Sequence, residues 1–249
     1  MVSFASEPVI RFGFVSITNS LLDTLLVDFL LIGGTLIVRK KLSLIPNFFQ
    51  NIVESVIETF YTLTESIAQN RTVIIFPYFM SFFLFILIAN WSGLIPGVGT
   101  IGFYEGKTFI PFLRGATNDL NTTLGLALVS AVATHMLSIK TVGIKEYLGR
   151  YFSLNPINFF IGILEIISEI TKVISLSFRL FGNIFAGEVV LLTTSSILAF
   201  IFPIPFLLLE IIVGLVQALV FGMLTMTFMA ILTTPHHETN NVKEVSNSL

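Results

Sequence analysis

The 249-residue sequence contains no cysteine, which excludes disulfide bonds, thiolate catalysis and cysteine-ligated metal sites. Charged residues are also scarce: they make up 11% of the chain, against about 25% in a typical soluble domain. No basic run is longer than Arg39 to Lys41, so nothing indicates a nucleic-acid-binding surface. Residues 1–16 lack the basic start and short apolar core of a signal peptide, and we expect none.

Apolar residues are abundant instead. They make up 54% of the sequence, and the mean hydropathy is +0.92. Such a composition is typical of a polytopic membrane protein. We therefore predict an all-α polytopic membrane protein, a single membrane domain with about five membrane-spanning helices and one amphipathic interfacial helix.

Three segments are predicted to span the membrane as ordinary helices: 17–38, 73–95 and 118–139. In segment 44–68, apolar residues recur at helical spacing against Asn and Glu. We predict an amphipathic helix there, at the cytoplasmic interface or against other helices. The first span contains two acidic residues, Asp23 and Asp28, whose role the sequence leaves open. We interpret Asp28 as a carboxylate that faces the helix bundle or is neutral at rest.

The last two helices are too long to cross a membrane upright. Residues 156–202 would measure roughly 70 Å at 1.5 Å per residue, and residues 206–234 roughly 43 Å, against a hydrocarbon core of about 30 Å. Pro203 and Pro205 are predicted to form the corner between them. We therefore expect a long, strongly tilted helical hairpin.

The distribution of basic residues predicts the orientation. Arg39, Lys40 and Lys41 follow the first span, and Lys140, Lys145 and Arg150 follow the span at 118–139. Because basic loops stay in the cytoplasm, we expect the N-terminus outside and the polar tail, 235–249, inside.

Arg179 lies in the middle of the first long helix, where an arginine costs roughly 2.5 to 3.5 kcal/mol at a bilayer centre. It shares one helical stripe with Glu165, Ser168, Glu169, Lys172, Ser175 and Asn183. One interpretation is a structural arginine paired with Glu169 or Glu188. The number of ionisable groups on the stripe favours a functional role.

The predicted orientation divides the polar residues into two groups. The inner group is Glu165, Glu169, Lys172 and Ser175, and the outer group is Asp119, Asn183, Glu188, Glu210 and Gln217. Arg179 separates them, which suggests two aqueous half-channels that do not meet. Arginine suits that position because guanidinium keeps its proton. No residue of this chain can carry an ion between the half-channels, so we expect a partner to supply a mobile carboxylate.

Three segments resemble subunit a of the rotary ATP synthase, in a bacterial form. They are Leu176-Ser-Phe-Arg-Leu-Phe-Gly-Asn-Ile-Phe-Ala-Gly-Glu188, the stretch that begins Asp119-Leu-Asn-Thr-Thr, and Leu215-Val-Gln-Ala-Leu-Val-Phe221. The resemblance covers about residues 17–238. It implies a non-catalytic stator subunit in which Arg179 faces a rotor ring of c subunits, with stator b subunits as further partners. It also implies that the five outer residues line the outer half-channel and that Glu165, Lys172 and Ser175 lie toward the inner one, although some relatives carry histidine at the position of Glu210.

The resemblance further implies a multi-pass protein of a bacterial plasma membrane, and we expect no cofactor. One alternative is a self-contained transporter or channel in which Arg179 binds an anionic substrate. Another is a structural scaffold for stator helices. We expect no metal site at His236 and His237, and we interpret His135 as a packing or interfacial residue. The sequence leaves open whether the ion is a proton or sodium.

Overall fold

The computed structural model describes residues 8–12, 15–40, 42–43, 46–95, 98, 101–105, 108–151, 156–197 and 203–234. Its long helices are α1 (Asn19–Lys40), α2 (Phe48–Ala68), α3 (Thr72–Ser92), α4 (Leu120–Val142), α6 (Pro156–Ile197) and α7 (Pro203–Thr233). Its shorter elements are the helices η1 (Gln69–Arg71), η2 (Ala116–Asn118) and α5 (Ile144–Tyr151), and the strand pairs β1 (Pro8–Phe12) with β2 (Val15–Thr18) and β4 (Gly102–Glu105) with β5 (Thr108–Pro111).

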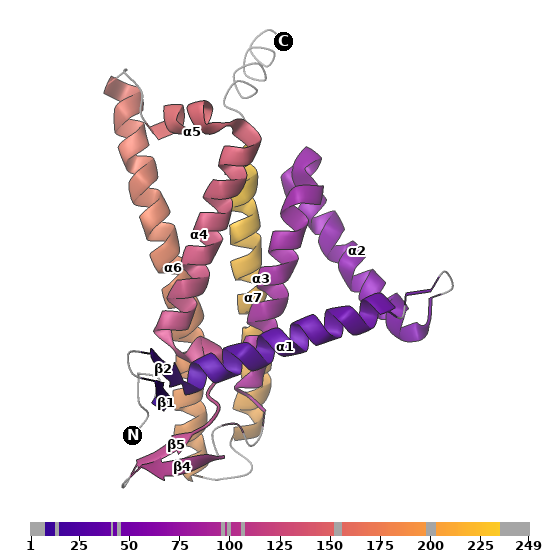
Figure 1. Cartoon of the computed structure of the whole chain (residues 1–249), viewed down its shortest axis with the longest axis vertical. Coiled ribbons are helices and arrows are strands. Elements are labelled where there is room, and N and C mark those ends of the chain that lie inside the picture. Colours follow the sequence, from indigo (N-terminus) through magenta and orange to yellow (C-terminus); the bar gives the residue numbers. More distant parts are fainter. Residues whose placement is uncertain are drawn as a thin grey trace.

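Helices α3, α4, α6 and α7 run side by side and form the body of the molecule, with α7 in contact with the other three (Figure 1). Helix α2 turns back along α3 through η1, and α5 lies across one end of the body, between α4 and α6. Helix α1 runs across this body instead of along it. It contacts α3 and η2, and its far end projects beyond them.

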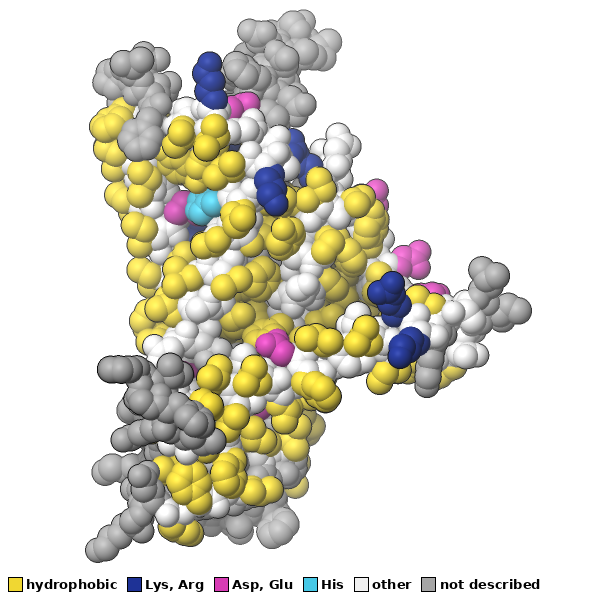
Figure 2. Space-filling model, viewed as in Figure 1, with side chains coloured by type: hydrophobic (Ala, Val, Ile, Leu, Met, Phe, Trp, Pro, Cys, Tyr) yellow, Lys and Arg dark blue, Asp and Glu magenta, His cyan; other side chains and the backbone are white. Residues whose placement is uncertain are grey.

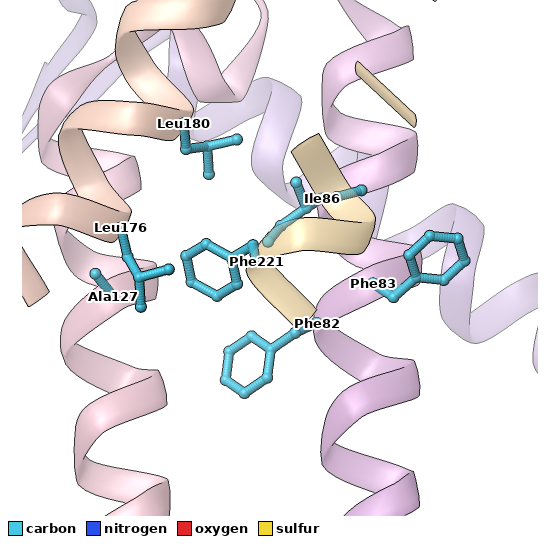
Figure 3. Close-up of a cluster of buried hydrophobic side chains, with 8 residues drawn as sticks. Phe82, Phe83, Ile86, Ala127, Leu176, Leu180 and Phe221 are labelled. Atoms are coloured by element: carbon cyan, nitrogen blue, oxygen red, sulfur yellow. The ribbon is translucent and has the colours of Figure 1, made fainter. Parts of the chain in front are cut away.

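The body is held together by a cluster of buried apolar side chains from all four helices (Figure 3). The cluster consists of Phe82, Phe83, Ile86, Ala127, Leu176, Leu180, Ala218 and Phe221. Small residues let the helices approach closely, as is common in membranes. A Cβ added to Gly222 of α7, for example, would lie 3.0 Å from Cε2 of Phe79, so the absence of a side chain makes room for α3.

Apolar side chains also cover much of the outer surface (Figure 2). On α1, for example, Leu25, Phe29 and Ile32 are all more than half exposed. Extensive exposed apolar surface marks a face that meets other proteins or lipid. In the described part of the chain, four segments are long and apolar enough to cross a membrane: Asn19–Lys40, Phe48–Ser92, Leu120–Val142 and Pro203–Thr233. Helix α6 is not among them, so the count of about five spans stays a prediction.

The structure differs from the sequence-based expectation in three places. Helix α7 begins at Pro203 and contains Pro205 in its first turn, where a proline costs no intrahelical hydrogen bond. Helix α5 was not predicted, because its eight residues are too few to show a clear helical period. The two strand pairs were not predicted either. The corner residues 198–202 and the tail 235–249 lie outside the described residues.

Candidate functional site

The polar side chains of the stripe on α6 point to two different sides: some toward α7 and others toward α4 and α5. Ser168, Lys172, Ser175 and Arg179 line a groove of about 440 Å³ between α6 and α7. Leu224 and Phe228 form its α7 wall, and the Lys172 ammonium lies 4.4 Å from the centroid of the Phe228 ring. The other predicted inner residues, Glu165 and Glu169, do not line this groove and instead contact side chains of α4 and α5.

Arg179 is exposed on the outer face of α6, while Leu176, Ser177 and Leu180 point into the body. Its Nη2 lies 3.5 Å from the hydroxyl of Ser175. Among the described residues, no carboxylate lies within ion-pair distance of its guanidinium. The arginine therefore presents its charge on an apolar surface of the molecule.

The proposed structural partners of Arg179 are engaged elsewhere. Oε1 of Glu169 accepts a hydrogen bond from Nζ of Lys172 at 2.8 Å. Oε2 of Glu188 accepts one from Nδ2 of Asn118 at 3.0 Å and lies 3.6 Å from Nη2 of Arg114. The interpretation of Arg179 as an intrachain ion pair with Glu169 or Glu188 is therefore wrong.

The inner residues form two ion pairs. Oε1 of Glu165 lies 3.7 Å from Nε of Arg150 on α5. Glu169 lies between Lys172 and His135, whose Nε2 is 3.7 Å from Oε2 of the glutamate. His135 was interpreted as a packing or interfacial residue, and the structure instead places it in a polar cluster. These charges are thus compensated inside the chain, in contrast to Arg179.

The outer residues of α6 and α7 meet across the interface between these helices. Nδ2 of Asn183 donates a hydrogen bond to Oε1 of Gln217 at 2.8 Å, one turn beyond Arg179 on α6. Further along, Asn90 of α3 donates to the carbonyl of Gly214 at 3.0 Å. Amide side chains thus link α3, α6 and α7 along one line.

Glu210 is buried, with 4% of its surface exposed, and lies against the backbone of α6 at Gly187. A Cβ added to Gly187 would lie only 2.6 Å from the carboxyl carbon of Glu210, so any larger residue would displace this carboxyl group from its place against α6. Oε2 of Glu210 has no hydrogen-bond partner in the described part of the chain. Glu210 also interacts electrostatically with Glu188, the residue that follows Gly187. The structure therefore brings two of the three predicted outer carboxylates, Glu188 and Glu210, together.

Asp119, the remaining predicted outer residue, has a different setting. It is the N-cap of α4: its Oδ1 accepts a hydrogen bond from the Asn121 amide at 3.0 Å, and its Oδ2 accepts one from Ser20 Oγ at 3.0 Å. Its neighbour Asn118, together with Arg114, contacts Glu188 instead. Sequence analysis missed both residues, although Asn118 stands beside Asp119 in the motif.

Asp23 of α1 holds this outer region in place. Its buried carboxylate accepts hydrogen bonds from Oγ of Ser92 at 2.7 Å and from the backbone N–H of Ala116 at 2.8 Å. Ser92 is the last residue of α3, and Ala116 is the first of η2. One side chain thus joins three elements, and it fixes the short helix that carries Asn118.

Replacement of Asp23 by alanine is expected to destabilise the fold by about 1 to 3 kcal/mol, because the buried N–H of Ala116 would lose its acceptor while the Ser92 hydroxyl would keep only the Ala89 carbonyl. The matched control is Glu65→Ala, which removes a carboxylate from the exposed face of α2, and for which we expect a change below about 0.5 kcal/mol. The measurement is thermal unfolding of the purified complex. Equal melting temperatures for the two variants would contradict this role of Asp23.

In the described residues, no three His, Asp or Glu side chains lie close enough together to hold a metal ion. The tail histidines, His236 and His237, lie outside the described residues.

Comparisons with known proteins agree on one family. Residues 21–230 match the family model described as ATP synthase A chain. ATP synthase subunit a of Moorella thermoacetica is 32% identical over 222 residues, which cover 89% of this chain and 94% of the relative. ATP synthase subunit a of Legionella pneumophila strain Paris is 32% identical over 228 residues, 91% of each chain. ATP synthase subunit a 2 of Pelobacter propionicus is 32% identical over 225 residues, 90% of this chain and 91% of the relative.

The resemblance based on the Arg179 motif is thus confirmed over most of the chain. Together with the apolar helices, it identifies a polytopic membrane subunit that takes part in ATP synthesis and ion transport without being catalytic itself. The chain belongs to the ATP synthase A chain family, the membrane-sector subunit a of the ATP synthase.

Proposed function

We propose that this chain carries ions to and from the rotor ring of the ATP synthase through two offset half-channels that Arg179 keeps apart. The inner half-channel contains Glu165, Glu169, Lys172 and Ser175, and the outer one contains Asp119, Asn183, Glu188, Glu210 and Gln217. Ion flow between them requires rotation of the ring, and this requirement couples transport to ATP synthesis.

One observation carries this proposal. Arg179 is exposed on an apolar face of α6, and no described residue places a carboxylate within ion-pair distance of it. An arginine inside a membrane needs a partner or a water path. Because the intrachain candidates are engaged elsewhere, the partner comes from another subunit. A carboxylate on a passing ring subunit has the required charge, and the groove beside Arg179 gives it room.

The magnitudes suit a reversible contact. An Arg–carboxylate pair near 4 Å is worth about 4 kcal/mol at an effective dielectric constant of 20. A membrane potential supplies about 2.3 kcal/mol per charge per 100 mV. Since the two energies are comparable, the pair can form and then break in each cycle.

The lengths of the helices support a tilted arrangement. With 42 residues, α6 measures about 63 Å, and α7 with 31 residues about 47 Å. Helix α1, with 22 residues, has the length of an upright span and runs across these helices in Figure 1. If α1 stands upright, α6 and α7 lie strongly tilted. A tilted α6 would present its groove along the side of the ring.

The partners we propose are the ring of c subunits at the groove and the stator b subunits elsewhere on the apolar surface. The far half of α1 is one such surface, because none of its described residues beyond Val27 is buried. It exposes Asp28 among apolar side chains, which suits a partner helix that can donate a hydrogen bond. We place the whole complex in a bacterial plasma membrane.

Orientation can be tested with cysteines, since the chain has none of its own. We expect a cysteine at Tyr104, which is exposed in the β4–β5 hairpin, to react with an impermeant thiol reagent added outside. A cysteine at Ser43, after the basic end of α1, should react only from inside. A cysteine at buried Val27 is the control and should react from neither side. The opposite labelling would overturn the orientation and the half-channel assignments with it.

The alternative of a self-contained transporter makes a different prediction. A transporter would move its substrate when the purified chain is reconstituted alone. The half-channel proposal requires the ring, so the isolated chain should leave the vesicles tight.

A further inference from the structure

A polar wedge lies between α4, α5 and α6. Helices α4 and α6 separate toward one end of the molecule, and α5 crosses the gap between them (Figure 1). Helix α5 closes on α6 because Gly162 has no side chain: a Cβ there would lie 2.9 Å from the carbonyl carbon of Tyr151. Ionisable side chains between membrane helices mark ion paths and relays more often than packing contacts.

A line of polar contacts runs through this wedge. The Tyr147 hydroxyl of α5 is hydrogen-bonded to Nδ1 of His135 on α4 at 3.0 Å. Nε2 of the same imidazole lies 3.7 Å from Oε2 of Glu169, and the other oxygen of Glu169 accepts from Nζ of Lys172 at 2.8 Å. Lys172 also lines the groove that contains Arg179. The line therefore connects α5 with the groove.

The α5 end of the line borders a small cavity. Ser138, Glu146, Tyr147 and Arg150 supply its polar wall, and its volume of about 10 Å³ is close to the space that one water molecule needs. The wedge is also partly open on its side, since the His135 side chain is 28% exposed and that of Glu169 16%. The cavity thus has room for one water molecule at the end of the line that lies away from the groove.

Two titratable groups of the described residues contact His135, Tyr147 of α5 and Glu169 of α6. Other titratable groups of the wedge interact with these two or with one another: Arg150 and Tyr151 on α5, and Glu165 and Lys172 on α6. Arg150 pairs with Glu165, and Lys172 pairs with Glu169. Burial raises the pKa of the Tyr151 phenol well above its ordinary value, so this group stays neutral. Histidine is the side chain that usually changes charge between about pH 5 and 8.

We propose that His135 and Glu169 are the proton relay of the inner half-channel, so that protons pass between α4, α5 and α6 on their way from the groove. This proposal rests on the half-channel function and names its inner route. A relay made of carboxylate, imidazole and phenol passes protons and offers no cage for sodium. The ion on this side of the ring is then a proton.

The proton moves along the relay in two transfers. A proton that arrives from the groove neutralises the Glu169 carboxylate and breaks its ion pair with Lys172. Glu169 then gives this proton to Nε2 of a neutral imidazole that carries a hydrogen on Nδ1. The imidazolium then releases the Nδ1 proton through the Tyr147 hydroxyl to water. A flip of the imidazole, or proton exchange with water, restores the starting arrangement of His135. The 3.7 Å gap is slightly beyond direct hydrogen-bond reach, and a side-chain rotation or one water closes it.

The test uses the complete complex in inverted membrane vesicles. ATP-driven proton pumping is measured while the pH on the cytoplasmic side is varied across the range in which histidine titrates. We expect His135→Ala and Glu169→Gln each to slow pumping severalfold and to flatten its pH dependence. The double variant should be no slower than the slower single one, because both residues serve one relay. Imidazole added on the cytoplasmic side should restore part of the rate in His135→Ala.

Met136→Ala is the matched control, since Met136 directly follows His135 on α4, is exposed and makes no polar contact in the wedge. A pH profile of His135→Ala parallel to that of the unmodified complex would overturn the relay, as would a loss that imidazole does not relieve. Arg179 is intact in all these variants, so pumping should stay coupled to ATP hydrolysis. Uncoupling would count against the half-channel proposal instead.

Discussion

Replacement of Arg179 by alanine or lysine is expected to abolish ATP-driven ion pumping, while the complex still assembles. Assembly should survive because Arg179 is exposed and the hydrogen bond from its Nη2 to Oγ of Ser175 is long, at 3.5 Å. The fold therefore does not depend on it. Pumping should fail because the positive charge between the half-channels is gone in the alanine variant.

Lysine is not an adequate substitute. A buried ammonium can lose its proton and become part of a relay, whereas guanidinium keeps its charge. Arg71→Ala provides a matched control, because Arg71 is partly exposed but lies in η1 between α2 and α3 and does not line the groove. Assembly is checked by co-purification of the other subunits, and pumping by acidification of vesicles. Normal coupled pumping in either Arg179 variant would refute the separator role.

The second large effect that we expect is a loss of ion flux when Glu188 or Glu210 of the outer half-channel is replaced. Glu210 lies against Gly187, next to Glu188, and the two carboxylates interact electrostatically. We propose that they serve one relay. Glu188→Gln and Glu210→Gln should each strongly reduce ion flux, since glutamine keeps the shape but cannot exchange a proton.

The double variant distinguishes one relay from two separate steps. If the residues form one relay, the double variant should be about as slow as the slower single variant. If they act independently, its residual rate should equal the product of the two single fractions. Glu65→Gln on the exposed face of α2 controls for the loss of a carboxylate elsewhere. A multiplicative result would separate Glu188 and Glu210 into different steps.

Much of this arrangement could be predicted from the sequence, because it depends on local patterns. The length of α6 and the spacing of its polar residues follow from helical geometry alone. The basic residues after the first span and after the span at 118–139 predict an orientation. The proximity of Glu188 and Glu210 could also be anticipated, since the helices that carry them are joined by a short corner.

Contacts between distant segments could not be predicted in the same way. Asn118 and Glu188 are 70 residues apart, and no periodicity connects them. A single histidine on an apolar helix, such as His135, looks like a packing residue until α5 and α6 supply its partners. Asp23 could be flagged as unusual but not explained, because its acceptor role depends on where Ser92 and Ala116 lie.

The separator role of Arg179 is tested most directly by the passive leak of the intact complex. Vesicles carry the complete complex with its ATP-hydrolysing sector inhibited, so that the ring cannot turn through full rotations, and proton entry is followed after a membrane potential is imposed. We predict that the unmodified complex is tight and that Arg179→Ala leaks, because a ring carboxylate can then move back and forth between the half-channels without a full turn. An Arg179→Ala complex as tight as the unmodified one would contradict the account.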